Sequence, residues 1–599
     1  MSIGDEGEVS ANVPVLIVGG GPTGLLTAFM LSALGVRSLV IEKYPERLAA
    51  PKAHALNPRS LEICRQFGLD TNEIRRLGTL RHEAYWVNFL TNLSGELIGR
   101  LPYERMDAAV LDDTPEMIHN VPQPHFEAYI AERLRHDPNV EIQKGVGFVL
   151  CKQQPNKVTT TVEERTTKAR WDIASRYVLA CDGAKSQVRQ NLGVETEGED
   201  GYESMMTIHF SADLRPVVGE RNGMLHWVMD PACSGFIICY DVRGNQVLIS
   251  NFDSARHPAD TWTEGLARDT VAAAIGQDIP IEVLSYRPWV LSRKVAKNYQ
   301  SGNVFLVGDA AHSFPPTGGL GLNSGLADAH NIACRIAAVQ NGWAHPSSLG
   351  KYNTERRPIA LVNASQSIKN GKKIFSFLKA VGTAEIDDID VARRNMLESV
   401  HNPAKQALIA EHIEAQREHF DNLGIHIGYV YGNDAPPANA SDFTAKFTPG
   451  ARLPHAWIRS LLSSDALPHG PLDTSYVGEY SATDVAARQW STLDLVSPGT
   501  FTIIAGQRHI WLRRFEELQK ALMPWALLLR LWTADTDFEF TQSSHRTLFE
   551  KDAGFTSGAA LLVRPDQHLL GCMSDSTTVR EMVELILRET GLAQGGRQR

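Results

Sequence analysis

Two glycine-rich loops carry the residue types that could bind a phosphate-containing cofactor. The first loop holds Gly19, Gly21 and Gly24 in the spacing G-x-G-x-x-G, after the apolar run VPVLIVG and before a helical pattern. Glycines at these positions allow a tight turn, a close approach of the backbone to a pyrophosphate, and close packing of helix on strand. Glu42 ends the next apolar run, where a carboxylate can accept hydrogen bonds from a ribose. The pattern predicts a dinucleotide-binding unit without choosing between NAD and FAD.

The second loop, GDAAHSFPPTGGLGLNSG at residues 308–325, favours FAD. Asp309 follows the apolar run NVFLVG, so its carboxylate would lie at the carboxyl edge of a parallel sheet, where it can hold a hydroxyl of a ribityl chain. Pro315 and Pro316 set a rigid bend before a flexible backbone. A helix that begins near Asn323 would direct its positive dipole end at the ligand, which suits the N1–C2=O edge of a reduced flavin. Asp182, in CDGAKSQVR, would add a carboxylate near the pyrophosphate.

The elements that position these loops follow from the apolar pattern. VPVLIVG, SLVIE and NVFLVG read as buried strands of a parallel sheet. Between about 205 and 256 the pattern changes to short stretches such as SMMTIHF and GFIICYD, which predict an antiparallel sheet inserted into the α/β domain. A charged helical region covers roughly 350–425, and NDAPPANASDF is typical of a linker before a last α/β domain.

We therefore expect an α/β and α+β protein of four parts. They are the first part of a Rossmann-like FAD-binding domain (1–200), the inserted substrate-binding sheet (201–300), the return of the FAD-binding domain with the helical region (301–425), and a C-terminal domain (440–599).

Composition narrows the function classes. A net charge of −10 over 599 residues gives no sign of nucleic-acid or anionic-membrane binding. No apolar run approaches a bilayer span, and the leader MSIGDEGEVSAN is acidic rather than basic. The seven cysteines form no CxxC pair, so neither a disulfide framework nor a metal site is expected. These features favour a reduced, cytoplasmic protein.

Three signatures together resemble one family. GGGPTG, DGAKSQVR and GDAAHSFPPTGGLGLN occur in the order found in single-component FAD-dependent aromatic hydroxylases with a para-hydroxybenzoate-hydroxylase-like fold. The chain is most similar to the phenol and chlorophenol hydroxylase branch, whose members add a C-terminal thioredoxin-like domain. Because that domain lacks CxxC here, we expect it to serve packing or dimer contacts rather than dithiol chemistry. The resemblance implies FAD, NADPH or NADH as cosubstrate, O2, a small aromatic substrate and a homodimer.

The resemblance also implies roles for single residues. Four of them would hold the ADP half of FAD: Gly19, Gly21, Gly24 and Glu42. Arg59 would contact the FAD phosphates, and Gln123 would contact the ribityl region. Asp182 would lie between FAD and the nicotinamide site. Asp309 would hold the ribityl chain, and the isoalloxazine would be lined by Pro316 and by the backbone of Gly321, Leu322 and Asn323.

The implied reaction needs a base. NAD(P)H reduces the flavin, O2 adds to form a C4a-hydroperoxide, and its distal oxygen attacks the ring ortho or para to a phenolic oxygen. A histidine suits the removal of the phenol proton. His54 is our candidate, because chlorophenol hydroxylases carry a His and phenol hydroxylases carry an Asp at this position. His312 is instead expected to stabilise the loop to which it belongs.

Residues of the inserted sheet would line the substrate cavity. Arg287 and Trp289 precede the second loop, and some of four others should face inward because side chains alternate along a strand: His226, Trp227, Cys239 and Tyr240.

Other functions remain open at this point. A Baeyer–Villiger or epoxidising monooxygenase would share the fold, whereas a halogenase is disfavoured because no WxWxIP stretch occurs. A non-catalytic FAD-fold protein would have little reason to retain the second loop. The substrate could be a simple phenol, a resorcinol type or a polyketide-derived aromatic.

Overall fold

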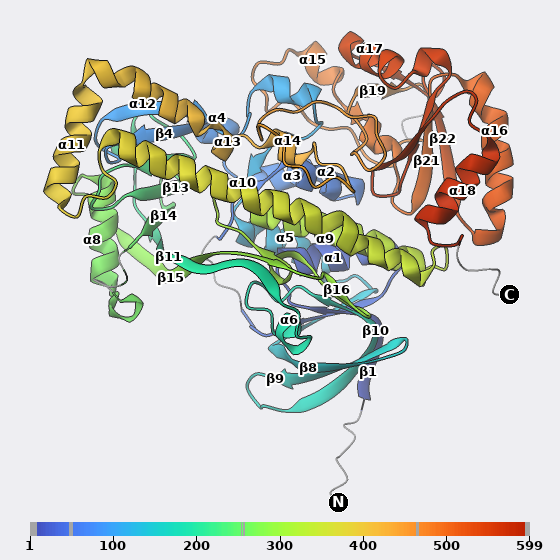
Figure 1. The fold of residues 1–599 in the computed structure, drawn as a ribbon, viewed down its shortest axis with the longest axis horizontal. Coiled ribbons are helices and arrows are strands. Elements are labelled where there is room, and N and C mark those ends of the chain that lie inside the picture. Colours follow the sequence, from blue (N-terminus) through green and yellow to red (C-terminus); the bar gives the residue numbers. More distant parts are fainter. Residues whose placement is uncertain (1–8, 47–51, 253, 255–257, 463–465, 594–599) are drawn as a thin grey trace, which may run out of the picture.

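The computed structural model describes residues 9–46, 52–252, 254, 258–462 and 466–593. Two eight-stranded sheets form the larger part of the molecule, and a four-stranded sheet forms the centre of the C-terminal part (Figure 1). The mixed α/β and α+β class predicted from the sequence is confirmed. Among the described residues, no helix is both long and apolar enough to cross a bilayer.

The first sheet has the strand order β16-β17-β10-β1-β2-β7. Its apolar strands are buried between helices, which explains why they read as continuous hydrophobic runs. The strands are β1 (Val9–Val18), β2 (Ser38–Glu42), β7 (Val140–Lys144), β10 (Arg170–Ala180), β16 (Gln300–Ser301) and β17 (Val304–Leu306), with β8 (Val146–Gln154) and β9 (Lys157–Glu164) extending from β10. The helices beside it are α1 (Pro22–Ala33), α5 (Gln123–Leu134), α6 (Gln187–Asn191) and α9 (Leu320–Gln340).

The second sheet has the order β18-β15-β11-β14-β13-β12-β4-β5. Its strands are β4 (Trp86–Leu90), β5 (Leu97–Pro102), β11 (Thr196–Ser211), β12 (Leu225–Val228), β13 (Gly235–Asp241), β14 (Asn245–Asn251), β15 (Glu282–Ala296) and β18 (His312–Ser313). The sheet is therefore larger than the predicted segment 201–300, because β4 pairs in parallel with β12 and brings β5 with it. Helix α8 (Glu264–Ile275) packs on its outer side.

The predicted helical region consists of a long helix and four shorter ones. They are α10 (Lys351–Val381), α11 (Ile389–His401), α12 (Pro403–Ala415), α13 (Arg417–Phe420) and α14 (Leu423–His426). Figure 1 shows α10 running across the molecule from the second sheet toward the C-terminal part.

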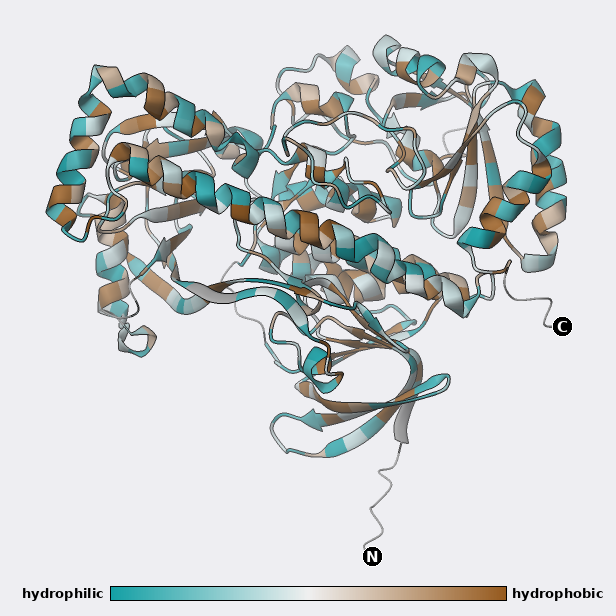
Figure 2. Cartoon of the chain, in the orientation of Figure 1, coloured by the Kyte–Doolittle hydropathy of each residue, from teal (hydrophilic) through white to brown (hydrophobic). Residues whose placement is uncertain are grey.

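The C-terminal part has the strand order β22-β21-β24-β25. The β21–β22 pair is parallel, whereas β24 and β25 run antiparallel to their neighbours. The elements are β21 (Thr500–Ala505), α16 (Arg508–Leu522), β22 (Leu528–Thr533), α17 (Ser543–Lys551), β24 (Ala560–Val563), β25 (Leu569–Met573) and α18 (Val579–Glu589). The apolar strands lie inside, between helices whose outer faces are polar (Figure 2). Its description as thioredoxin-like stays a prediction.

Smaller elements connect these parts. They are β3 (Ala55–Leu56), α2 (Pro58–Gln66), α3 (Thr71–Arg76), α4 (Arg81–Ala84), β6 (His119–Asn120), α7 (Arg215–Val218), β19 (Trp457–Ser460), α15 (Ala482–Ala486), β20 (Trp490–Ser491) and β23 (Phe538–Phe540).

Buried ion pairs attach the C-terminal part to the rest. Arg65 of α2 pairs with Asp494 at 2.7 Å, and Arg564 pairs with Glu355 of α10 at 2.8 Å. The indole N–H of Trp457 donates to the carbonyl of Leu111 at 2.7 Å. The two parts are thus joined by desolvated polar contacts as well as by packing.

Candidate functional site

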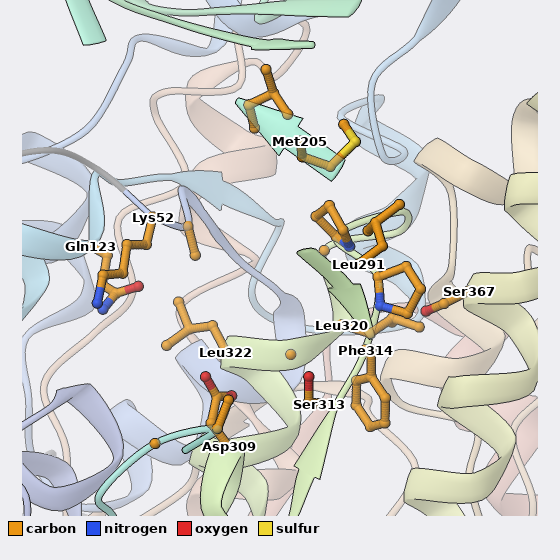
Figure 3. A pocket seen from close by; sticks show the side chains of 18 of the residues that line it. Lys52, Gln123, Met205, Leu291, Asp309, Ser313, Phe314, Leu320, Leu322 and Ser367 are labelled. Carbon is orange, nitrogen blue, oxygen red and sulfur yellow. The ribbon is translucent and has the colours of Figure 1, made fainter. Parts of the chain in front are cut away.

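A cavity of about 1860 Å³ lies between the carboxyl edge of the first sheet and the inner face of the second. Typical small-molecule sites have volumes of about 300–1,000 Å³. The cavity therefore has room for two ligands, one beside each sheet. Figure 3 shows its centre, with Asp309 and Leu322 on the side of the first sheet and Met205 on the side of the second.

The G-x-G-x-x-G loop forms one end of this cavity. A Cβ atom on Gly19, which has φ +107°, would lie 2.3 Å from the carbonyl oxygen of Cys181. A Cβ on Gly24 would lie 2.0 Å from the carbonyl oxygen of Gly19. Gly21 caps α1, whose first residue is Pro22. Only glycine fits the two crowded positions, and the loop presents its backbone to the cavity.

Glu42 and Asp182 flank this loop. The Glu42 carboxylate accepts hydrogen bonds from the N–H groups of Gly20 and Tyr44, both at 2.9 Å, and so is held at the end of β2. One oxygen of Asp182 accepts from the N–H of Val188 at 3.1 Å, whereas its other oxygen is buried and has no hydrogen-bond partner among the residues that the structure describes. Burial raises the pKa of the Asp182 carboxyl. The residues of this end fit a ligand that supplies hydroxyl groups and phosphates.

Asp309 occupies the position predicted for it. It follows β17 in a short 3-10 turn, and its carboxylate points into the cavity (Figure 3). Desolvation raises the pKa of Asp309, although the nearby charges of His312 and Lys52 act to lower it.

The loop after Asp309 delivers backbone donors to the cavity. Helix α9 begins at Leu320 rather than near Asn323, because Gly319 takes the left-handed conformation, with φ +63°, at its N-cap. Pro316, Gly321 and Leu322 all line the cavity. The N–H groups of a helix's first turn have no acceptor inside the helix. Gly321 and Leu322 can therefore donate to a ligand, in the direction of the helix dipole.

Asn323 was expected to line the isoalloxazine through its backbone, but it is not among the residues that line the cavity. Its side-chain oxygen accepts from the N–H of Asn57 at 2.9 Å and from the hydroxyl of Ser60 at 2.7 Å. Its amide group donates to the carbonyls of Ala55 and Gly319. Asn323 lies one turn inside α9, and its side-chain hydrogen bonds connect α9 to α2.

Arg59 also departs from its prediction. Its guanidinium is buried, pairs with Glu62 at 3.0 Å and donates to Gln567 at 2.7 Å and to the carbonyl of Asp566 at 3.1 Å. These partners lie on α2 and in the C-terminal part, and Arg59 does not line the cavity. The expectation that Arg59 contacts the cofactor phosphates is therefore wrong for this structure.

Lys52 is one of several cationic side chains that line the cavity and that the sequence pattern did not indicate. It is exposed, lines the cavity, and lies on the same side of it as Gln123 (Figure 3). The Gln123 amide donates to Glu127 at 2.7 Å, which holds that side chain at the start of α5. The sequence feature that could have indicated this cation is the lysine in PKAHALNPRS, seven positions before Arg59. Lys52 is thus better placed than Arg59 to neutralise a phosphate.

His54 lines the cavity and begins a chain of polar side chains. Its Nε2 lies 3.0 Å from the hydroxyl of Tyr103, and its ring lies 5.8 Å from that of Tyr240. Glu104 follows Tyr103 in the chain, and burial raises the pKa of its carboxyl well above the usual value. Burial lowers the pKa of His54 to about 4, so the ring is neutral at neutral pH and can accept a proton.

The inner face of the second sheet is largely apolar. Alternation directs Leu225, Trp227, Phe236 and Ile238 to the cavity, whereas His226 and Cys239 are buried away from it. Arg287 lines the cavity, as predicted for a substrate-site residue. Trp289 instead donates from its indole to the hydroxyl of Thr207 at 2.9 Å, and it does not line the cavity.

His312 is a structural residue, as expected. Its Nε2 lies 2.7 Å from the carboxylate of Asp328 on α9, and its ring stacks on Phe314 at 4.7 Å. No group of three or more His, Cys, Asp or Glu side chains suited to a metal occurs in the described part of the chain.

Comparisons with known proteins agree with this geometry. The family described as FAD binding domain matches residues 12–367. The 2,4-dichlorophenol 6-monooxygenase of Delftia acidovorans is 28% identical over 522 residues, which cover 82% of this chain and 84% of that protein. The tetracenomycin B2 monooxygenase-dioxygenase of Streptomyces olivaceus is 29% identical over 74% of this chain and 80% of its own length. The crystal structure of the flavin-dependent monooxygenase PieE with FAD and substrate is similar with a TM-score of 0.82, at 25% identity, over 98% of this chain and 100% of that one.

Proposed function

Because the chain belongs to the family described as FAD binding domain, we propose that it is an FAD-dependent monooxygenase that hydroxylates a phenolic aromatic compound with NAD(P)H and O2. One observation carries this proposal: a single cavity joins a loop suited to a dinucleotide with the apolar face of a sheet and with His54. FAD, when bound, supplies reduction by NAD(P)H and the activation of O2.

The residues of the first sheet would hold FAD. Glu42 offers a carboxylate to a ribose, Lys52 a positive charge to a phosphate, and Asp309 a carboxylate to the ribityl chain. The N–H groups of Gly321 and Leu322 would stabilise negative charge on the reduced ring. A ligand hydroxyl would donate to the Asp182 oxygen that has no partner in the described part of the chain.

The residues of the second sheet would orient the substrate and exclude water. The apolar face around Trp227, Phe236 and Ile238 binds an aromatic ring by burial. Neutral His54 accepts the phenol proton at Nε2 or shares it through the hydroxyl of Tyr103. Removing that proton increases the electron density of the ring, which the hydroxylation requires.

A substrate screen tests this function directly. The holoenzyme is mixed with NADPH or NADH and a panel of phenols while NAD(P)H consumption and H2O2 are followed together. We expect at least one phenol to accelerate consumption without peroxide and to yield a product heavier by one oxygen. A purified protein without bound flavin, or a panel in which no phenol yields such a product, would contradict the proposal.

The comparisons favour ring hydroxylation over a Baeyer–Villiger or epoxidising reaction. Product structure separates them, since only the former adds a hydroxyl to an intact ring. We also propose the four-part division of the chain, a thioredoxin-like C-terminal domain without redox function, a homodimer, and a cytoplasmic location.

A further inference from the structure

One stripe of helix α10 lines two cavities. Ile368, Lys372 and Ser376 are spaced by four residues, so they lie along one face of the helix. All three line the main cavity, and all three also line a second cavity of about 480 Å³, to which His412 of α12 contributes. Figure 3 shows Ser367 of the same helix pointing toward the main cavity. The stripe is therefore the lip at which the two cavities meet.

The main cavity opens to solvent beside this lip. Lys372, Phe375 and Ser376 are exposed and also line the main cavity, and the exposed fraction of Phe375 is 47%. On the same helix, the buried ring of Phe377 packs against Trp227 of the second sheet, with ring centroids 6.0 Å apart. The lip thus leads to the apolar face that the proposed function assigns to the substrate ring.

Lys372 is the unpartnered cation in a cluster of three lysines at this lip. Lys369 and Lys373 line the second cavity and donate to the carboxylate of Glu418, at 2.7 and 2.5 Å. The ammonium of Lys372 has no hydrogen-bond or ion-pair partner among the described residues. Glu411 of α12 also lines the second cavity, so two carboxylates stand against three lysines. A positive excess at a cavity mouth attracts anions and favours their entry.

We propose that Lys372 determines substrate specificity: the substrate is a phenol with an anionic substituent, such as a carboxylate, and Lys372 binds that substituent at the lip. This inference rests on the proposed function, because it places the phenol ring on the apolar face of the same cavity. The aliphatic stem of Lys372 and the ring of Phe375 offer apolar contacts near the mouth, whereas the ammonium pairs with the anion. An uncharged substituent of the same shape gains nothing from the ammonium, so Lys372 selects for charge.

Equilibrium binding to the holoenzyme tests the inference without turnover. The probes are phenols with a carboxylate at the end of a para alkyl chain of increasing length, each compared with its primary amide while the flavin spectrum is followed. The chain lengths sample the span from the ring to the lip. At low salt we expect at least one carboxylate to bind about fivefold more tightly than its amide, which is the upper range for an exposed ion pair. At about 0.5 M salt the preference should fall below about twofold, because salt screens exposed charges.

Variants identify the residue. In Lys372→Met we expect the carboxylate preference to fall below about twofold with unchanged binding of the amide, because only the charge is lost. In Lys372→Glu the amide should bind more tightly than the carboxylate. Lys379→Met is the matched control and should keep the preference, because Lys379 is exposed on the same helix and lines neither cavity. Flavin content reports whether each variant is folded.

Two results would overturn the inference. One is equal binding of every carboxylate and its amide in the unaltered protein at low salt. The other is a preference that survives in Lys372→Met. Product analysis with the same probes separates the two proposals. A carboxylate preference that depends on Lys372, without any hydroxylated product, refutes the function alone, whereas hydroxylation of the probes without such a preference refutes the inference alone.

Discussion

Exchanging Arg59 for methionine should destabilise the protein without weakening its hold on FAD. The guanidinium is 2% exposed and loses three contacts in the variant, to Glu62 at 3.0 Å, Gln567 at 2.7 Å and the Asp566 carbonyl at 3.1 Å. Breaking a buried ion pair by removing one partner costs about 3–5 kcal/mol. Glu62 retains the hydroxyl of Thr114 at 2.7 Å and Arg452 at 3.7 Å, so we expect a loss near 3 kcal/mol.

Urea unfolding followed by tryptophan fluorescence measures this loss, and titration of the apoprotein measures FAD affinity. For Arg59→Met we expect a lower midpoint and an FAD Kd within about twofold of the original, since a change under 0.4 kcal/mol is about twofold. Lys52→Met is the matched control: Lys52 is exposed, so stability should change by less than about 0.5 kcal/mol while FAD affinity falls about tenfold. Unchanged stability with lost FAD affinity in Arg59→Met would refute this prediction. It would show instead that Arg59 contacts the phosphates of FAD.

Three further predictions concern the cofactor cradle and the base. Gly24→Ala places a Cβ 2.0 Å from the Gly19 carbonyl oxygen, so the purified variant should lack flavin, which the ratio of flavin to protein absorbance shows; a flavin-replete variant would contradict the crowding. His54→Ala should keep its flavin but lose about 10²-fold in coupled hydroxylation, and unchanged turnover would remove His54 from the mechanism. Because burial lowers the pKa of His54 to about 4, the proton-accepting ring predominates above that pH, and the acid limb of kcat/KM should fall near pH 4; a limb at the ordinary value near 6.5 would show that His54 is solvated.

Local patterns predicted the geometry of the glycine-rich loop and the position of Glu42 beside it. The tight turn at Gly19, the capped start of α1 and the carboxylate of Glu42 all depend on neighbours within one strand–helix–strand unit, which periodicity and glycine spacing describe. The loop at Asp309 was recognisable for the same reason.

Long-range contacts were not predictable in this way. Arg59 bonds a residue 508 positions away, and Asn323 bonds Asn57 across 266 positions, so nothing near either residue indicates its partner. The second sheet exceeded its predicted segment because the pairing of β4 with β12 joins strands more than a hundred residues apart.

The incorporation of oxygen from isotopically labelled O2 tests the central claim most directly. The holoenzyme is supplied with labelled O2, NADPH and the best substrate of the screen, and the product is examined by mass spectrometry. We predict one labelled oxygen atom in a hydroxyl on an intact aromatic ring, at a yield that matches NADPH consumed. Labelled oxygen found only in H2O2, or a product hydroxylated with unlabelled oxygen from water, would contradict the account.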